Sequence, residues 1–155
     1  MRLTAFGALL ALGALACGGA KKADQSQAQT QTPAAQSAAT QPAGPVVEVK
    51  MTGNGSTQAT FVPNAVTIAP GTTVRFVNVS GGPHNIAFYG DSIPAGAAAA
   101  LNAGMANRQD NLSGPFLTTP NENYDVSFAG APTGVYKGYC LPHVALGMKI
   151  TITVK

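Results

Sequence analysis

The 155-residue sequence has no tryptophan, and charged residues make up only 10% of it. From residue 45 onward it carries six Lys and Arg against five Asp and Glu, so this part of the chain is nearly neutral. Nucleic-acid-binding proteins usually present a basic stripe with interleaved aromatic residues. Because the sequence lacks both features, we exclude nucleic acid as a partner.

The sequence is also poor in cysteine, with only Cys17 and Cys140. Residues 1–16 contain one arginine and then an apolar run that is too short to span a membrane, which is typical of a signal peptide. The run ends Ala14-Leu15-Ala16-Cys17, which resembles the cleavage box of bacterial lipoproteins. We therefore expect an exported lipoprotein, anchored through Cys17 to a membrane of the cell envelope or periplasm. The alternative is an ordinary leader cysteine that is cut off downstream.

Residues 17–44 are expected to form a lipid-anchored, disordered tether. After Cys17 the segment is rich in Ala, Gln, Ser and Thr, with no aliphatic residue larger than Ala, so it cannot bury enough apolar surface to fold. A random coil of this length reaches roughly 30 Å. The folded domain is then expected at residues 45–155, which suffices for one two-layer core. With Cys17 lipidated, Cys140 is the domain's only thiol, so no intramolecular disulfide forms.

Short alternating runs separated by turn signals predict an all-β domain. In the run 72–79, for example, Val74 and Phe76 share one face. Seven or eight such strands predict a Greek-key β-sandwich. The alanine-rich stretch 95–105 predicts a short helix within an irregular excursion at 91–120. The predicted strands are 46–51, 59–68 with an interruption near Pro63, 72–79, 85–89, 123–128 paired with 135–139 through a turn at 130–134, and 149–154.

Three residues near the C-terminus have the spacing of a metal-binding loop. Cys140, His143 and Met148 stand as Cys-x2-His-x4-Met between two predicted strands, so one short loop can wrap one ion. His84, the only other histidine, lies in a Gly-Gly-Pro turn signal. Two imidazoles, one thiolate and a weak axial thioether suit both Cu(I) and Cu(II). The sequence therefore predicts a blue-copper site that holds one copper ion.

The ligand residues also allow another metal or purely structural roles. Zinc is the rival metal, although structural zinc prefers closed sets of Cys and His, and methionine is a poor zinc ligand. Cys140 would otherwise be a buried free cysteine, and Met148 would merely pack beneath the last strand. We expect the copper site because all the histidines and the domain's only thiol then have a role.

The same residues carry a resemblance to a known family. The run 134–148 is similar to the copper loop of plastocyanins and related bacterial cupredoxins. Pro83-His-Asn-Ile-Ala-Phe88 resembles the segment that bears the family's first histidine ligand, and 61–78 resembles its early strand pair. The match covers about residues 46–155. It implies a mobile one-electron carrier between redox complexes, and not an enzyme.

Four further residues are expected beside the metal or on the electron path: Pro83, Asn85, Tyr139 and Pro142. The resemblance implies that Asn85 joins the two ligand loops and that its backbone N–H donates to the thiolate. The family often has a hydroxyl residue after the cysteine to receive the Asn side chain, but Leu141 stands there. Pro142 lacks an N–H near the sulfur, which should raise the reduction potential. Tyr139 matches an aromatic residue at the family's second electron-transfer surface, with strand packing as the alternative.

The expected partners are membrane-bound or soluble redox proteins that dock near His143, whose neighbours 144–146 are apolar. Plant-type plastocyanins have an acidic docking region, as the resemblance implies, but residues 91–120 contain only Asp91 and Asp110 beside Arg108. An acidic docking region is therefore not predicted. We also expect the protein to be a monomer. The alternative function is copper binding or delivery, although delivery sites expose their sulfur ligands. A copper oxidase or reductase would need more histidines than the chain has.

Overall fold

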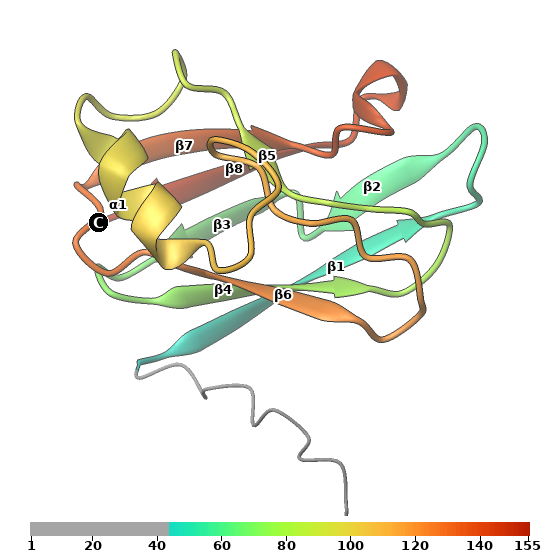
Figure 1. The fold of residues 1–155 in the computed structure, drawn as a ribbon, viewed down its shortest axis with the longest axis horizontal. Helices are drawn as coiled ribbons and strands as arrows, with labels where there is room; N and C mark the ends of the chain where they lie inside the picture. The colour runs from blue at the N-terminus through green and yellow to red at the C-terminus, as the bar shows by residue number, and fades with distance from the viewer. Residues whose placement is uncertain (1–43) are drawn as a thin grey trace, which may run out of the picture. The chain divides into compact units, whose positions relative to one another are not determined.

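Two four-stranded sheets pack face to face in the computed structural model, which describes residues 44–155 (Figure 1). One sheet has the strand order β2-β1-β4-β6 and the other β3-β8-β7-β5. The predicted all-β sandwich is confirmed, with eight strands in this part of the chain. In chain order the elements are β1 (Val46–Gly53), β2 (Ala59–Val62), β3 (Ala65–Ile68), β4 (Thr73–Asn78), β5 (Ala87–Phe88), α1 (Ala97–Gly104), β6 (Asn123–Ser127), β7 (Gly134–Tyr139), η1 (Val144–Leu146) and β8 (Lys149–Val154).

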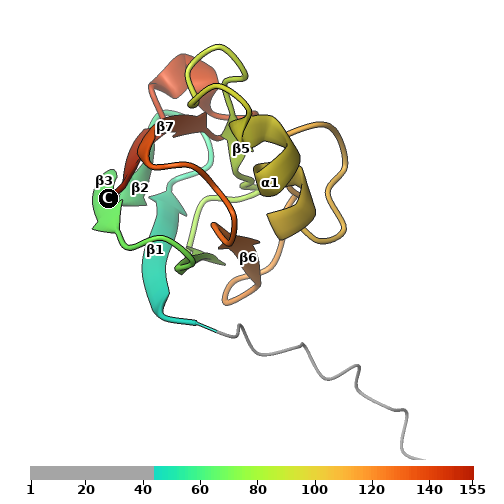
Figure 2. The same ribbon diagram turned by 90° about the vertical axis from the view of Figure 1, so that its left-hand side faces the viewer.

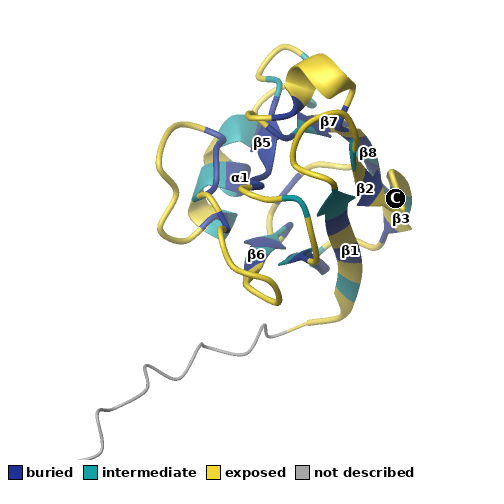
Figure 3. Cartoon of the chain, turned by 90° about the vertical axis from the view of Figure 1, so that its right-hand side faces the viewer, coloured by how far each residue is buried: buried dark blue, intermediate teal, exposed yellow. Residues whose placement is uncertain are grey.

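The core lies between the sheets, because alternate residues of each strand point inward. Val74 and Phe76 of β4 are fully buried, as the alternation predicts, and so is Ile152 of β8. In Figure 3 buried residues (dark blue) gather in the strands, whereas most connecting loops are exposed (yellow). Phe61 and Phe76 meet edge to face with ring centroids 5.8 Å apart. Burying each such side chain stabilises the fold by about 1.5–3 kcal/mol.

The segment predicted as one interrupted strand at 59–68 is two strands in different sheets. β2 pairs with β1 in the first sheet, and β3 pairs with β8 in the second. Pro63 lies between them, and proline has no N–H with which to continue a ladder. The chain therefore leaves one layer at this residue and enters the other.

The predicted pairing of 123–128 with 135–139 is wrong. β6 pairs with β4, whereas β7 pairs with β5 and β8 in the opposite sheet. Phe128 and Tyr136 instead face each other across the core, with ring centroids 5.3 Å apart. Alternation predicts which side of a strand is buried but not which sheet the strand joins, so the sequence pattern could not separate a hairpin from a crossing between layers.

The excursion between β5 and β6 covers one flank of the sandwich. α1 lies there beside β5 and β6 (Figure 2), with Ala97 and Leu101 buried. The short helix predicted at 95–105 is thus confirmed. Further along the excursion, Leu117 returns to form an antiparallel bridge with His84. The excursion therefore contacts the segment that carries the first predicted metal ligand.

Some predictions concern residues that the structure does not describe. The signal peptide at 1–16, the lipid anchor on Cys17 and the tether up to residue 43 lie outside the described residues. Within residues 44–155, no helix is long and apolar enough to cross a membrane.

Candidate metal centre

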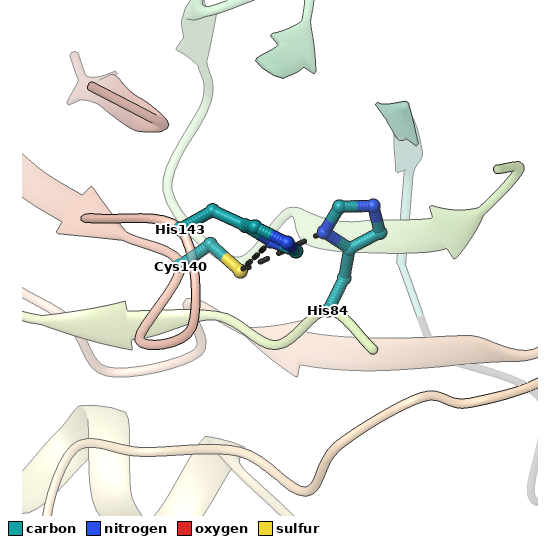
Figure 4. A group of neighbouring side chains, drawn as sticks. All are labelled: His84, Cys140 and His143. Atoms are coloured by element: carbon teal, nitrogen blue, oxygen red, sulfur yellow. Dashed lines mark hydrogen bonds between the residues drawn. The ribbon is translucent and has the colours of Figure 1, made fainter. Parts of the chain in front are cut away.

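Three predicted ligands meet at one end of the sandwich. The ligand atoms of His84, Cys140 and His143 all lie within 4.8 Å of one another, and all three residues are buried. Cys140 Sγ is 3.7 Å from His84 Nδ1 and 3.5 Å from His143 Nδ1. Figure 4 shows both imidazole rings directed at the sulfur. Side chains 56 residues apart in the sequence therefore form one cluster.

The spacing of these atoms fits a single metal ion. Sulfur and nitrogen ligands at about 2.0–2.3 Å from an ion, at angles between tetrahedral and trigonal, lie roughly 3.6–3.8 Å from each other. The two sulfur–nitrogen distances, 3.7 and 3.5 Å, are close to this range. One ion placed among the three atoms would therefore contact all of them with little rearrangement of the chain.

The loop after β7 is closed by hydrogen bonds between backbone groups of the loop itself. The N–H of Cys140 donates to the carbonyl of Met148 at 3.1 Å, so the first and last residues of the loop lie side by side. The N–H of Met148 in turn donates to the backbone carbonyl of His143 at 3.2 Å. Gly147 ends the η1 turn with φ 79°, in the left-handed region that favours glycine. The loop thereby places Cys140, His143 and Met148 at one end of the sandwich.

His84 is fixed through both its backbone and its ring. Its N–H and C=O exchange hydrogen bonds with Leu117, at 3.0 and 2.8 Å. Its Nε2 lies 2.9 Å from the carbonyl oxygen of Ser80, which can only accept, so Nε2 carries the proton. Nδ1, which faces the sulfur, is then free to bind a metal.

No pattern in the sequence indicates the role of Ser80. Its hydroxyl bonds both the N–H and the C=O of Gly53, at 3.3 and 3.1 Å. The adjacent Gly81 lies so close to Gly53 that an added Cβ would clash with the Gly53 carbonyl group. The end of β1 thus positions the carbonyl that orients His84. No local signal marks this contact, because Ser80 and Gly53 are 27 residues apart.

Asn85 joins the two ligand segments, and its partner differs from the one the family resemblance suggests. Its Oδ1 accepts the backbone N–H of Leu141 at 2.8 Å, so no hydroxyl is needed after the cysteine. Its Nδ2 donates to Ser113 Oγ and Gly114 O, both at 3.3 Å. Its own N–H points at Cys140 Sγ at 3.5 Å. One buried side chain therefore ties the His84 segment to the copper loop and to the excursion.

The other predicted residues lie around this cluster. Met148 is fully buried at the end of the loop. Tyr139 precedes Cys140 in β7 and is partly exposed, whereas Pro83 and Pro142 are exposed next to His84 and the copper loop. Residue 142, being proline, has no N–H to offer the sulfur.

Burial keeps the metal-binding groups neutral. It lowers the pKa of His84, an effect opposed by the hydrogen bond to Ser80. The pKa of His143 is lowered by burial and by the nearby His84 ring. Burial raises the pKa of the Cys140 thiol, while the backbone N–H groups of Asn85 and His143 act in the opposite direction. At pH 7 the metal-free site therefore holds two neutral imidazoles and a thiol.

A β-sandwich that gathers two imidazoles, a thiol and a thioether at one end defines a mononuclear metal protein. A family model described as copper binding proteins of the plastocyanin/azurin family matches residues 47–155. Plastocyanin of Scenedesmus fuscus is 42% identical over 109 residues, which are 70% of this chain and 99% of that protein. Chloroplastic plastocyanin of Chlamydomonas reinhardtii is 43% identical over 95 residues, 61% of this chain and 58% of that protein.

A solved structure agrees with these relatives. The oxidized form of plastocyanin from Dryopteris crassirhizoma superimposes with a TM-score of 0.54 and 30% sequence identity, covering 70% of this chain and 100% of that one. The chain belongs to the plastocyanin/azurin family of copper-binding proteins. The predicted resemblance is thereby confirmed, and copper rather than zinc is the metal of this site.

The neutral site predicts proton release on metal binding. Copper binds cysteine as thiolate. Because the Cys140 pKa is raised and both histidine pKa values are lowered, binding of one Cu(I) at pH 7 should release about one proton. Calorimetric titration in two buffers of different ionisation enthalpy measures this number. Cys140→Ser should release almost none. Release of no proton by the unaltered chain would mean that a thiolate is already present, and release of two would mean that a histidine is charged.

The contacts of Asn85 predict a large effect on stability. Asn85→Ala removes three hydrogen bonds made by a side chain that is 1% exposed. It should lower the free energy of unfolding of the metal-free protein by about 2–4 kcal/mol and speed copper loss to a chelator. Denaturant unfolding provides the measurement. Asn123→Ala, at an exposed position in β6, is the matched control and should change stability by less than about 0.5 kcal/mol. Equal stabilities of the two variants would refute the joining role of Asn85.

Proposed function

We propose that this chain is a mobile one-electron carrier of the cell envelope, with His84, Cys140, His143 and Met148 as the ligands of one type 1 copper ion. Copper bound there supplies a Cu(II)/Cu(I) couple. The observation that carries the proposal is that the ligand atoms of His84, Cys140 and His143 lie within 4.8 Å of one another and that all three residues are buried. Ligands that are held by burial and by hydrogen bonds need little rearrangement when the oxidation state changes, which favours fast electron transfer.

Burial of the ligands favours a carrier over a copper-delivery protein. His84, Cys140 and Met148 are 0% exposed. A protein that passes copper to an acceptor must let the acceptor's ligands reach the metal, so delivery sites expose their sulfur atoms. Here both sulfur atoms are covered by protein. Copper delivery is therefore the second candidate function. We propose no enzymatic activity, because both histidines serve as ligands and none is left for another copper centre.

His143 gives the site its contact with the surface. It is 6% exposed, whereas His84 is 0% exposed. The loop around it presents large apolar side chains to solvent: Leu141 is 46%, Val144 36% and Leu146 39% exposed. Figure 3 shows this η1 turn as an exposed part of the chain. We propose that membrane-bound or soluble redox proteins dock on this apolar surface, and that the carrier works as a monomer.

The N-terminal residues suggest where the carrier works. The apolar run at 1–16 is followed by Cys17 and by a polar segment of low complexity. We propose export, lipidation of Cys17 and a tether up to residue 44 that lets the copper domain search a volume close to the membrane.

The expected binding of copper by the Met148 thioether predicts that replacing this residue changes the reduction potential. The amide oxygen of glutamine is a harder donor than a thioether and stabilises Cu(II), so Met148→Gln should lower the potential while the protein remains blue. Met148→Leu removes the donor altogether and should raise it. Each 59 mV corresponds to about a tenfold change in the equilibrium constant of a one-electron couple, which voltammetry resolves easily.

Met105→Gln is the control, because Met105 is also buried but bridges to Val126 on the flank of the sandwich. It should lower stability and leave the potential unchanged. If folded, copper-loaded Met148→Gln and Met148→Leu proteins both keep the original potential, Met148 is a packing residue and not a ligand.

Lipidation of Cys17 predicts a membrane-bound protein. The full-length chain, expressed in a bacterial host that processes lipoproteins, should partition into the detergent phase after phase separation. Cys17→Ala should move it to the aqueous phase, whereas Cys140→Ala, which removes the other cysteine, should leave it in the detergent phase. Equal partitioning of the unaltered chain and Cys17→Ala would contradict the anchor.

A further inference from the structure

The last residue of β4, Asn78, is buried beside the segment that carries His84. Its side chain is 1% exposed. The side-chain Nδ2 donates to the carbonyl oxygens of Leu117 and Thr119, both at 3.1 Å. The carbonyl oxygen of Leu117 also accepts the backbone N–H of His84, at 3.0 Å. One oxygen atom therefore joins the Asn78 amide to the backbone of the first predicted metal ligand.

The backbone of Asn78 is held by the same turn. Its N–H donates to the carbonyl of Glu122 at 2.8 Å, and its carbonyl accepts the N–H of Asn121 at 2.7 Å. The turn is also closed within itself, because the Glu122 carboxylate accepts the N–H of Thr119 at 2.7 Å. The end of β4 and residues 117–122 therefore form one hydrogen-bonded unit.

The two carbonyl groups fix the orientation of the Asn78 amide. Turning the amide over would place its Oδ1 against two carbonyl oxygens, and neither of them can donate a hydrogen bond. In the observed orientation Oδ1 is buried and has no hydrogen-bond partner among the described residues. A buried unpaired oxygen costs about as much free energy as one or two hydrogen bonds contribute. The net contribution of this amide to stability is therefore small.

Both carbonyl groups have a hydrogen bond without the amide. Leu117 O accepts the N–H of His84, and Thr119 O accepts the N–H of Glu122 at 3.2 Å. Removing the Asn78 amide would thus leave neither oxygen unpaired. The amide instead supplies a second restraint on the carbonyl that holds the His84 backbone.

The restraints on His84 both begin at the end of β4. Its ring Nε2 donates to the carbonyl of Ser80, two residues after Asn78, at 2.9 Å. Its backbone is bound to Leu117, which the Asn78 amide holds. Because ring and backbone are fixed from one place, the end of β4 sets the direction of Nδ1 toward Cys140, as Figure 4 shows it.

We propose that Asn78 is a positioning residue of the copper site, which acts on His84 through the Leu117 carbonyl. The amide holds the His84 backbone so that Nδ1 keeps its distance of 3.7 Å from Cys140 Sγ. This proposal rests on the proposed function, in which His84 is a ligand of one copper ion. It assigns part of the metal geometry to a residue whose own side chain bonds only two backbone carbonyls.

Amide hydrogen exchange in the full-length, Cu(I)-loaded protein tests the link between Asn78 and His84. Asn78→Ala should speed exchange of the His84 and Leu117 N–H groups about tenfold, because their pair of hydrogen bonds loses its support. The N–H of Ile152, in the ladder of β7 and β8, should exchange at an unchanged rate. Asn78→Leu, which has as many side-chain heavy atoms and no donor, tests the same prediction if Asn78→Ala does not fold.

The geometry at the metal is tested on the same variants. A less firmly held His84 should change the electron paramagnetic resonance spectrum of the Cu(II) form, and a Cu(I) chelator should remove copper about tenfold faster. The reduction potential should rise, because a weakened imidazole ligand destabilises Cu(II) more than Cu(I). A purely structural role of Asn78 would leave the spectrum and the potential unchanged.

Asn102→Ala is the matched control. Asn102 also makes two side-chain hydrogen bonds, to Asn111 Oδ1 at 2.6 Å and from the N–H of Leu112 at 2.9 Å, but neither reaches residues 117–122. This variant should keep the His84 exchange rate, the copper-loss rate and the potential of the unaltered chain.

Two results would overturn the positioning role and leave the carrier function intact. One is an equal His84 exchange rate in Asn78→Ala and Asn102→Ala. The other is faster exchange in Asn78→Ala with unchanged copper loss, spectrum and potential. The carrier function fails separately if the unaltered chain binds copper without a blue colour. Faster exchange of the His84 N–H in Asn78→Ala would then still confirm the link from Asn78 to His84.

Discussion

The copper-binding cluster depends on one buried side chain that joins its own segment to two others. Asn85 accepts the Leu141 N–H at 2.8 Å and donates to Ser113 and Gly114. Its position next to His84 means that these bonds set the distance between the first histidine and the copper loop. An unpaired polar group at this depth would cost about 1–3 kcal/mol, so the amide and its partners hold one another in place. Hydrogen bonds of the protein itself therefore set the positions of His84 and the copper loop.

Much of the site could be predicted because its chemistry is local. Cys140, His143 and Met148 lie within nine residues, and a short loop has few ways to place them. His84 could be predicted as the fourth ligand because it is the only other histidine. The supporting contacts could not be predicted, since they join distant segments: Ser80 with Gly53, and Asn85 with Ser113. Neither pair has a sequence pattern that marks it.

In the fold, too, local features could be predicted from the sequence and long-range pairings could not. Alternation correctly identified inward-facing residues such as Val74 and Phe76, because burial of every second residue is a property of a single strand. The partners of β6 and β7 depend on how the two layers pack, which no single strand encodes. Phe128 and Tyr136 illustrate this, since they contact each other across the core and not along a ladder. The excursion also supports the metal site, which its irregular sequence did not suggest. Leu117 pairs with His84, and Ser113 accepts a hydrogen bond from Asn85.

The central claim is that these side chains form a type 1 copper site, and the visible absorption spectrum of the Cu(II)-loaded protein tests it most directly. A thiolate bound to Cu(II) in a trigonal His2Cys set gives an intense blue colour. We expect that colour in the unaltered chain, its disappearance on reduction to Cu(I), and its loss in copper-loaded Cys140→Ser. A colourless or pale Cu(II) complex of the folded, unaltered chain would contradict the account.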